Sequence, residues 1–108
     1  MTNDVEWLPD HVALVTYFAC NEAIQNAMKH AGPAATIDVD IRLLDDQNGS
    51  RVEFSVADDG VGCDQGRLEA GHGIRALSHR LDEVGGTLVA TSEPGCGTRL
   101  TGTIPVMR

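Results

Sequence analysis

Residues 36–59, TIDVDIRLLDDQNGSRVEFSVADD, contain the pattern that decides the fold. Apolar and polar residues alternate in each half, as expected of a β-strand with one buried face. Asn48-Gly49 lies between the two halves, and this dipeptide favours a tight turn. The stretch therefore predicts an antiparallel hairpin, with Ile37, Val39, Ile41 and Leu43 inward on the first strand and Val52, Phe54 and Val56 inward on the second.

The flanking segments predict two helices and a second hairpin. Upstream, a long helix opens at Pro9-Asp10 and runs to about Ala31, where Gly32 stops it. Downstream, residues 60–73 hold five glycines without a clear period, which indicates a long mobile loop. The remaining elements are a helix with the apolar stripe Ile74, Leu77, Leu81 and Val84, a stop at Gly85-Gly86, and a hairpin of residues 87–92 and 98–106.

Each predicted strand has one apolar face and one polar face. A sheet covered by helices on both faces would show continuous apolar runs instead. We therefore expect an α/β fold, a two-layer sandwich with helices on one face of a mixed but mostly antiparallel sheet. At 108 residues the chain is expected to form a single domain.

The net charge of the chain restricts the kinds of molecule that it is expected to bind. The net charge is −8, with 16 acidic and 8 basic residues, which argues against nucleic acid and against direct membrane contact. A bound phosphate would have to be held locally, by backbone N–H groups, one or two cations, or a metal. Cys20, Cys63 and Cys96 are odd in number and lack C-x-x-C spacing, which argues against disulfides and zinc and favours a reducing compartment.

The long N-terminal helix carries polar residues in an otherwise apolar setting. Glu22 and Asn26 lie one turn apart, and Lys29 and His30 lie on the next turn. An unpaired polar group costs roughly 2–7 kcal/mol when it is buried. Either these side chains satisfy each other in the core, or they face a ligand.

The second strand also ends with a polar residue at a position that is expected to face the core. Its alternation points Asp58 inward, where the carboxylate either caps the turn that follows or accepts a hydrogen bond from a ligand amine. Gly60 and Gly62 follow and let the backbone lie close to a flat ligand. Gly71 and Gly73 open the next helix, where they permit a bend or form an anion site from free N–H groups.

Other nucleotide motifs do not fit the chain. No G-x-x-x-x-G-K-[ST] sequence is present, which excludes a Walker-type site. Gly71-x-Gly73-x-x-Ala76 fits a dinucleotide fingerprint only superficially, because CDQGRLEA before it is not an apolar strand.

Taken in order, the motifs NEAIQNAMKHAG, DDGVG, GHGIRALSHRLDEVGG and PGCGTRL resemble the ATP-binding catalytic domain of sensor histidine kinases, which has the Bergerat fold of the GHKL ATPases. The sequences of these motifs are similar to those of the NarX- and DesK-like branch of the sensor histidine kinases. The resemblance covers roughly residues 8–106. It implies binding of ATP and Mg²⁺. Glu22 would be the catalytic base or orient water, Asn26 would hold Mg²⁺, Lys29 would reach the phosphates, and His30 would lie near the ribose or adenine.

The resemblance also implies roles in the glycine boxes. Asp58 would accept from the adenine amine, and Thr98 would support a water near it. His72 either contacts phosphate or is an exposed residue without a role in binding. The full nucleotide-binding set is Asn26, Lys29, His30, Asp58, Gly60, Gly62, Gly71, His72, Gly73, Ile74, Gly97 and Thr98.

In this family the phospho-accepting histidine lies on a separate dimerisation helix. Residues 1–10 contain no His, so the chain is expected to be a catalytic domain excised from a larger sensor kinase. Its partners would be that dimerisation domain and, downstream, a response regulator. We expect a cytoplasmic domain and leave a membrane anchor of the parent open. Two alternatives remain: a stand-alone serine kinase of the anti-sigma-factor type, and a non-catalytic nucleotide-binding module.

Overall fold

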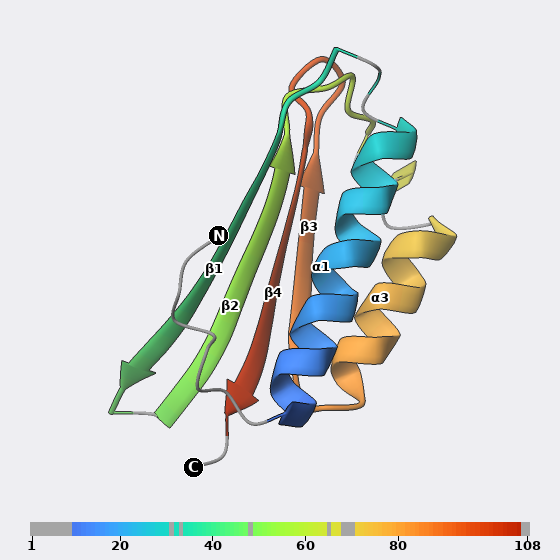
Figure 1. Ribbon diagram of the computed structural model, residues 1–108. Helices are drawn as coiled ribbons and strands as arrows, with labels where there is room; N and C mark the ends of the chain where they lie inside the picture. Colours follow the sequence, from blue (N-terminus) through green and yellow to red (C-terminus); the bar gives the residue numbers. More distant parts are fainter. Residues whose placement is uncertain are drawn as a thin grey trace.

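The structure is a computed structural model that describes residues 10–30, 32, 34–47, 49–64, 66–67 and 71–106, apart from the side chains at positions 11, 30, 46 and 72. Figure 1 shows two helices side by side on one face of a sheet. The elements are α1 (Asp10–His30), β1 (Ile37–Asp46), β2 (Gly49–Asp58), α3 (His72–Asp82), β3 (Thr87–Ser92) and β4 (Thr98–Val106).

The sheet has four strands in the order β1-β2-β4-β3. Every pairing between these described strands is antiparallel, so the parallel component of a mixed sheet is not found among them. β1 pairs with β2 from Ile37 opposite Asp58 to Asp46 opposite Gly49, and Gly49 has φ +115°. The predicted first hairpin and the two-layer α/β class are confirmed.

The core lies between the sheet and the two helices. The inward apolar residues of β2, Val52, Phe54 and Val56, are at most 2% exposed, as their alternation predicts. Gly102 on β4 lies opposite Phe54 on β2, and a Cβ at this position would overlap the Phe54 ring. The buried apolar set is Val12, Ala19, Cys20, Ala23, Ile41, Val52, Phe54, Val56, Leu77, Leu81, Leu100, Ile104 and Val106.

The helix ends follow the expected glycine signals. Gly32 beyond α1 has φ +100°, and Gly85 beyond α3 has φ +78°. The N–H of Gly86 donates to the carbonyl of Leu81 at 2.8 Å, which satisfies one of the last carbonyl groups of α3. No helix in the described ranges is long and apolar enough to cross a membrane.

The loop prediction for residues 60–73 is only partly correct. Residues 61–64 are irregular, but Gly66 and Arg67 are helical. Asp64 Oδ1 accepts a hydrogen bond from the Arg67 N–H at 3.0 Å, the geometry of a helix N-cap. Residues 65 and 68–70 of the predicted loop lie outside the described residues.

Candidate nucleotide site

Three neighbouring strands bring polar residues together at one end of the sheet. Asp58 ends β2 and pairs with Thr98, the first residue of β4. Thr98 in turn pairs with Ser92, the last residue of β3. All three continue the inward faces of their strands, so they lie in a row on the helix side of the sheet.

Asp58 caps the turn that follows it. Its Oδ1 accepts a hydrogen bond from the Gly60 N–H at 2.9 Å. The capping role considered for this residue is therefore present. A carboxylate offers about four acceptor positions on two oxygens, so one such bond leaves acceptor capacity for a ligand. Because the side chain is only partly buried, a ligand can reach it.

Ser92 is a member of the site that the sequence analysis missed. It is 7% exposed, and its hydroxyl donates to the Gly97 carbonyl at 2.9 Å and accepts from the Cys63 N–H at 2.9 Å. Its Oγ also lies 2.8 Å from Thr98 Oγ1. Since a hydroxyl has one proton, the Thr98 hydroxyl donates to Ser92 and keeps its own lone pairs for a donor such as water.

The substitution Ser92→Ala is expected to lower the free energy of unfolding by about 1 kcal/mol, because it removes hydrogen bonds to two main-chain groups. Urea unfolding monitored by circular dichroism measures this change. Ser78→Ala is the matched control, since Ser78 is an exposed residue of α3, and it should leave the midpoint unchanged. Equal midpoints for the two variants would show that the Ser92 hydroxyl does not hold the loops.

Gly62, in the loop after β2, and Gly97, in the loop after β3, each pack closely against a carbonyl group of the facing segment. Gly62 has φ +62°, and a Cβ there would overlap the carbonyl of Glu93. Gly97 has φ +78°, and a Cβ there would overlap the carbonyl of Asp58. The Gly95 N–H donates to the Val61 carbonyl at 2.7 Å. These contacts bring the predicted residues Gly60, Gly62 and Gly97 together beside Asp58.

Asn26 and Gly73 meet across the two helices. A Cβ at Gly73 would lie 2.7 Å from Asn26 Oδ1 and 2.8 Å from Asn26 Nδ2, so the amide lies flat against the start of α3. Asn26 Nδ2 is buried and has no hydrogen-bond partner. A buried amide N–H without an acceptor is costly, so this group is suited to a bound ligand with an acceptor oxygen. A phosphate oxygen is such an acceptor.

The start of α3 offers further donors. Gly71 precedes the helix with extended backbone and gives no side-chain cap. The first N–H groups of a helix have no partner within it, and together with the helix dipole they attract anions. The predicted anion site at Gly71 and Gly73 is thus compatible with the backbone.

The remaining predicted residues lie along α1 or outside the described side chains. Glu22 is half-buried one turn before Asn26, and Lys29 is exposed near the C-terminal end of α1. The side chains of His30 and His72 lie outside the described residues. Burial raises the pKa of the Cys20 thiol to about 11, so this group stays protonated at neutral pH and acts as a packing residue.

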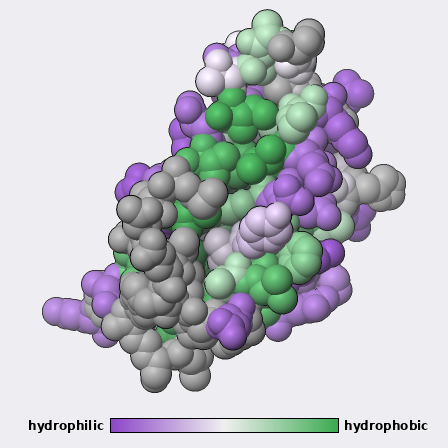
Figure 2. Space-filling model, in the orientation of Figure 1, coloured by the Kyte–Doolittle hydropathy of each residue, from purple (hydrophilic) through white to green (hydrophobic). Residues whose placement is uncertain are grey.

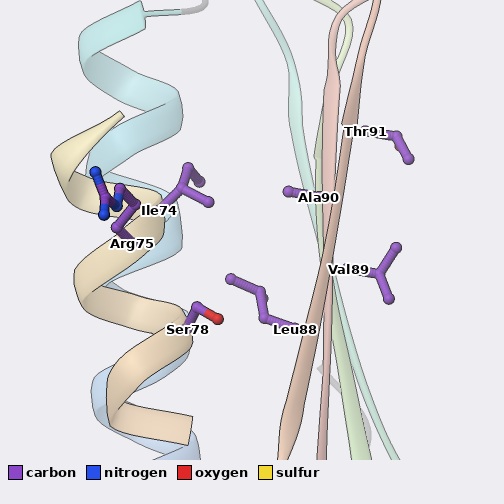
Figure 3. A pocket seen from close by; sticks show the side chains of 7 residues that line it. All are labelled: Ile74, Arg75, Ser78, Leu88, Val89, Ala90 and Thr91. Atoms are coloured by element: carbon purple, nitrogen blue, oxygen red, sulfur yellow. The ribbon is translucent and has the colours of Figure 1, made fainter. Parts of the chain in front are cut away.

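A separate groove of about 550 Å³ lies between α3 and β3. Figure 3 shows Ile74 and Ser78 from α3 pointing toward Leu88 and Ala90 of β3. The side chain of Ile74, predicted to bind nucleotide, therefore lies in this groove, while its main-chain N–H remains at the start of α3. Among the residues with described side chains, no group of three His, Cys, Asp or Glu could hold a metal ion.

The inward face at one end of the sheet carries a row of acceptors, and the helix layer carries helix-terminal donors and a buried amide; this combination of groups is suited to a nucleotide. Comparison with protein families agrees that the chain is a nucleotide-binding protein. Residues 13–108 match the histidine kinase-, DNA gyrase B- and HSP90-like ATPases. The chain belongs to this family, whose members bind ATP.

Two individual relatives are signal transduction histidine-protein kinases/phosphatases. The chain is 30% identical to the signal transduction histidine-protein kinase/phosphatase UhpB of Salmonella typhimurium, over 97% of the chain and 21% of the relative. It is 29% identical to the signal transduction histidine-protein kinase/phosphatase DegS of Brevibacillus brevis, over 94% of the chain and 25% of the relative. The chain thus spans about a quarter or less of the length of these proteins. The NarX- and DesK-like branch remains a prediction.

A solved structure is also similar. The blue-light activated histidine kinase of Erythrobacter litoralis superposes with a TM-score of 0.72 at 25% identity, over 92% of this chain and 32% of that one. Its histidine kinase domain gives a TM-score of 0.68 over 91% of this chain and 46% of that one. The fold is therefore the Bergerat fold expected from the sequence.

Proposed function

We propose that this chain is the ATP-binding catalytic domain of a sensor histidine kinase, which transfers the γ-phosphoryl group of ATP to a histidine on a separate dimerisation domain. The observation that supports this most directly is the buried Asn26 amide, which lies against Gly73 without a partner. A response regulator would act downstream of that domain, and the acidic charge of the chain makes nucleic acid an improbable partner.

Each residue of the nucleotide site has its own role in this proposal. Asp58 accepts from the adenine amine, and Thr98 accepts from a water beside it. The N–H groups at the start of α3 and the Lys29 ammonium bind phosphate oxygens. Asn26 would hold Mg²⁺ through its side-chain oxygen, and the metal, when bound, would supply positive charge that offsets the charge of the phosphates. Glu22 would receive the proton of the attacking imidazole or orient that ring.

The isolated domain is expected to bind Mg-ATP weakly and to hydrolyse it slowly, without labelling itself. The physical reason is that it offers a nucleotide site but no acceptor histidine on a docking helix. Incubation with γ-labelled ATP, alone and with the dimerisation domain of the parent kinase, measures this. The label should appear only on the added domain and should be acid-labile, as expected of phosphohistidine.

Stable label on any of the four histidines of this chain would contradict the proposal. Acid-stable label on a serine of an added sigma-factor antagonist would favour the anti-sigma-factor alternative. Nucleotide binding without any transfer would favour a non-catalytic module.

A further inference from the structure

Ser92 is one of two buried polar residues in the part of the chain that the structure describes; the other is Thr16. The Thr16 hydroxyl donates to the Val12 carbonyl one turn earlier in the same helix, so its hydrogen bond is local. Ser92 instead bonds to Cys63, which is 29 positions away, and to Gly97 in the loop after β3. A buried hydroxyl that connects two loops beside a ligand site is placed to position groups that bind the ligand.

The two loops that Ser92 connects have little hydrophobic packing of their own. Among the described residues, the buried core and the apolar residues packed against it include none from positions 59–64 or 93–97. Val61 is 61% exposed. Figure 2, in the orientation of Figure 1, shows pale residues of intermediate hydropathy at the end of the molecule where these loops lie. Hydrogen bonds therefore have a large share in holding the loops in place.

The hydrogen bonds of Ser92 fix the direction in which the Thr98 hydroxyl points. A carbonyl oxygen can only accept, so the Ser92 proton lies toward the Gly97 carbonyl, 2.9 Å away. Thr98 is therefore the donor in the 2.8 Å hydrogen bond between the two hydroxyl groups. Hydrogen bonds that run in one direction strengthen one another, so the Gly97 carbonyl sets the direction of the whole chain. The lone pairs of Thr98 remain for a group that donates.

Thr98 lies beside the carboxylate of the nucleotide site. Asp58 pairs with Thr98 across β2 and β4, and side chains at such paired positions have Cβ atoms about 4.5–5.5 Å apart. Both residues are half-buried, so a ligand can reach them. An ionised carboxylate only accepts hydrogen bonds, and Ser92 leaves Thr98 in the same state toward the ligand. The pair therefore presents acceptors to an amine or a water molecule.

We propose that Ser92 is a positioning residue for the nucleotide: it holds Thr98 with its lone pairs toward the donor group that binds beside Asp58. This inference rests on the proposed function, since it takes an adenine nucleotide and its bound water as the ligand. Through the Cys63 N–H, Ser92 also connects the loop after β2 to the same chain of hydrogen bonds. One hydroxyl group thus holds both the base contact and the two loops.

Calorimetric titration of the whole chain with ATP and Mg²⁺ tests the proposal through a double-mutant cycle. Ser92→Ala leaves the Thr98 proton without its acceptor, so ATP affinity should fall by about fivefold. Thr98→Val removes the hydroxyl and keeps a similar shape. In the Thr98→Val background, Ser92→Ala should cause almost no further loss, because Ser92 acts through Thr98. Ser78→Ala on α3 is the matched control and should bind ATP as the wild type does.

The outcomes separate a positioning role from a structural one. If Ser92 only stabilised the loops, Ser92→Ala would lower ATP affinity by the same factor in both backgrounds, and that result would overturn the proposal. Unchanged ATP affinity of Ser92→Ala would also overturn it. If the wild-type chain bound no ATP, the proposed function would fail together with this inference, so the two failures are distinguishable.

Amide hydrogen exchange gives a second readout that does not depend on the fold tolerating Ser92→Ala. In the wild type, saturating ATP should slow exchange of the Cys63 N–H at least about threefold, because a donor at Thr98 strengthens the chain of hydrogen bonds that ends at this amide. In Thr98→Val at saturating ATP, this slowing should be lost. Equal slowing in the two proteins, measured by NMR, would refute the proposed connection through Ser92.

Discussion

Replacement of Glu22 by Gln is expected to lower phosphoryl transfer to a supplied dimerisation domain by about 100-fold or more, the usual loss when a general base is removed. Glu22 is half-buried on α1, one turn before Asn26. Gln keeps the shape and most hydrogen bonds of Glu but cannot take up a proton at neutral pH. Nucleotide binding should therefore persist while transfer is lost. Single-turnover transfer from labelled ATP and calorimetric titration measure the two effects separately.

Asn26→Ala is the companion variant for this test. Its amide is the buried group expected to face phosphate and metal, so its removal should weaken the magnesium-dependent part of ATP binding. Titrations with and without Mg²⁺ distinguish the two variants. If both lose the same share of affinity under both conditions, the separate roles of Glu22 and Asn26 are wrong.

Much of the fold could be predicted because the relevant signals are local. Alternation with a period of two assigns the faces of a strand without any knowledge of its partners. The same rule placed Asp58 on the inner face at the end of β2, where the structure has it. Gly62 and Gly97, singled out from the motifs, both adopt positive φ beside it.

The rest of the site depends on contacts between distant segments. Asn26 and Gly73 are 47 positions apart, and only the packing of α1 against α3 brings them together. Ser92 had a usable local signal, since it is a polar residue at the inward end of β3, as Asp58 is on β2. Its bonds to Cys63 and Gly97, however, cross between loops and have no signature in the sequence.

The substitution Asp58→Asn is expected to reduce ATP affinity and to narrow the preference for ATP over GTP. An ionised carboxylate only accepts hydrogen bonds, and adenine offers an amine where guanine offers a carbonyl oxygen. A mismatched buried acceptor costs on the order of 1–3 kcal/mol, so wild type should prefer ATP by about tenfold or more. Asn adds an NH₂ donor that can turn toward the guanine carbonyl, which should improve GTP binding relative to ATP.

The control for this substitution is one residue further along the chain. Asp59 is exposed, and its Oδ1 accepts from the Thr36 N–H at 2.6 Å, so its carboxylate is engaged with the chain before β1. Asp59→Asn makes the same change of charge and should leave the ATP-to-GTP ratio as in wild type. Paired calorimetric titrations of the three proteins with both nucleotides give the ratio directly. If Asp58→Asn leaves the ATP-to-GTP ratio unchanged, Asp58 does not read the base. If both variants change the ratio equally, the general loss of negative charge explains the change, and again Asp58 does not read the base.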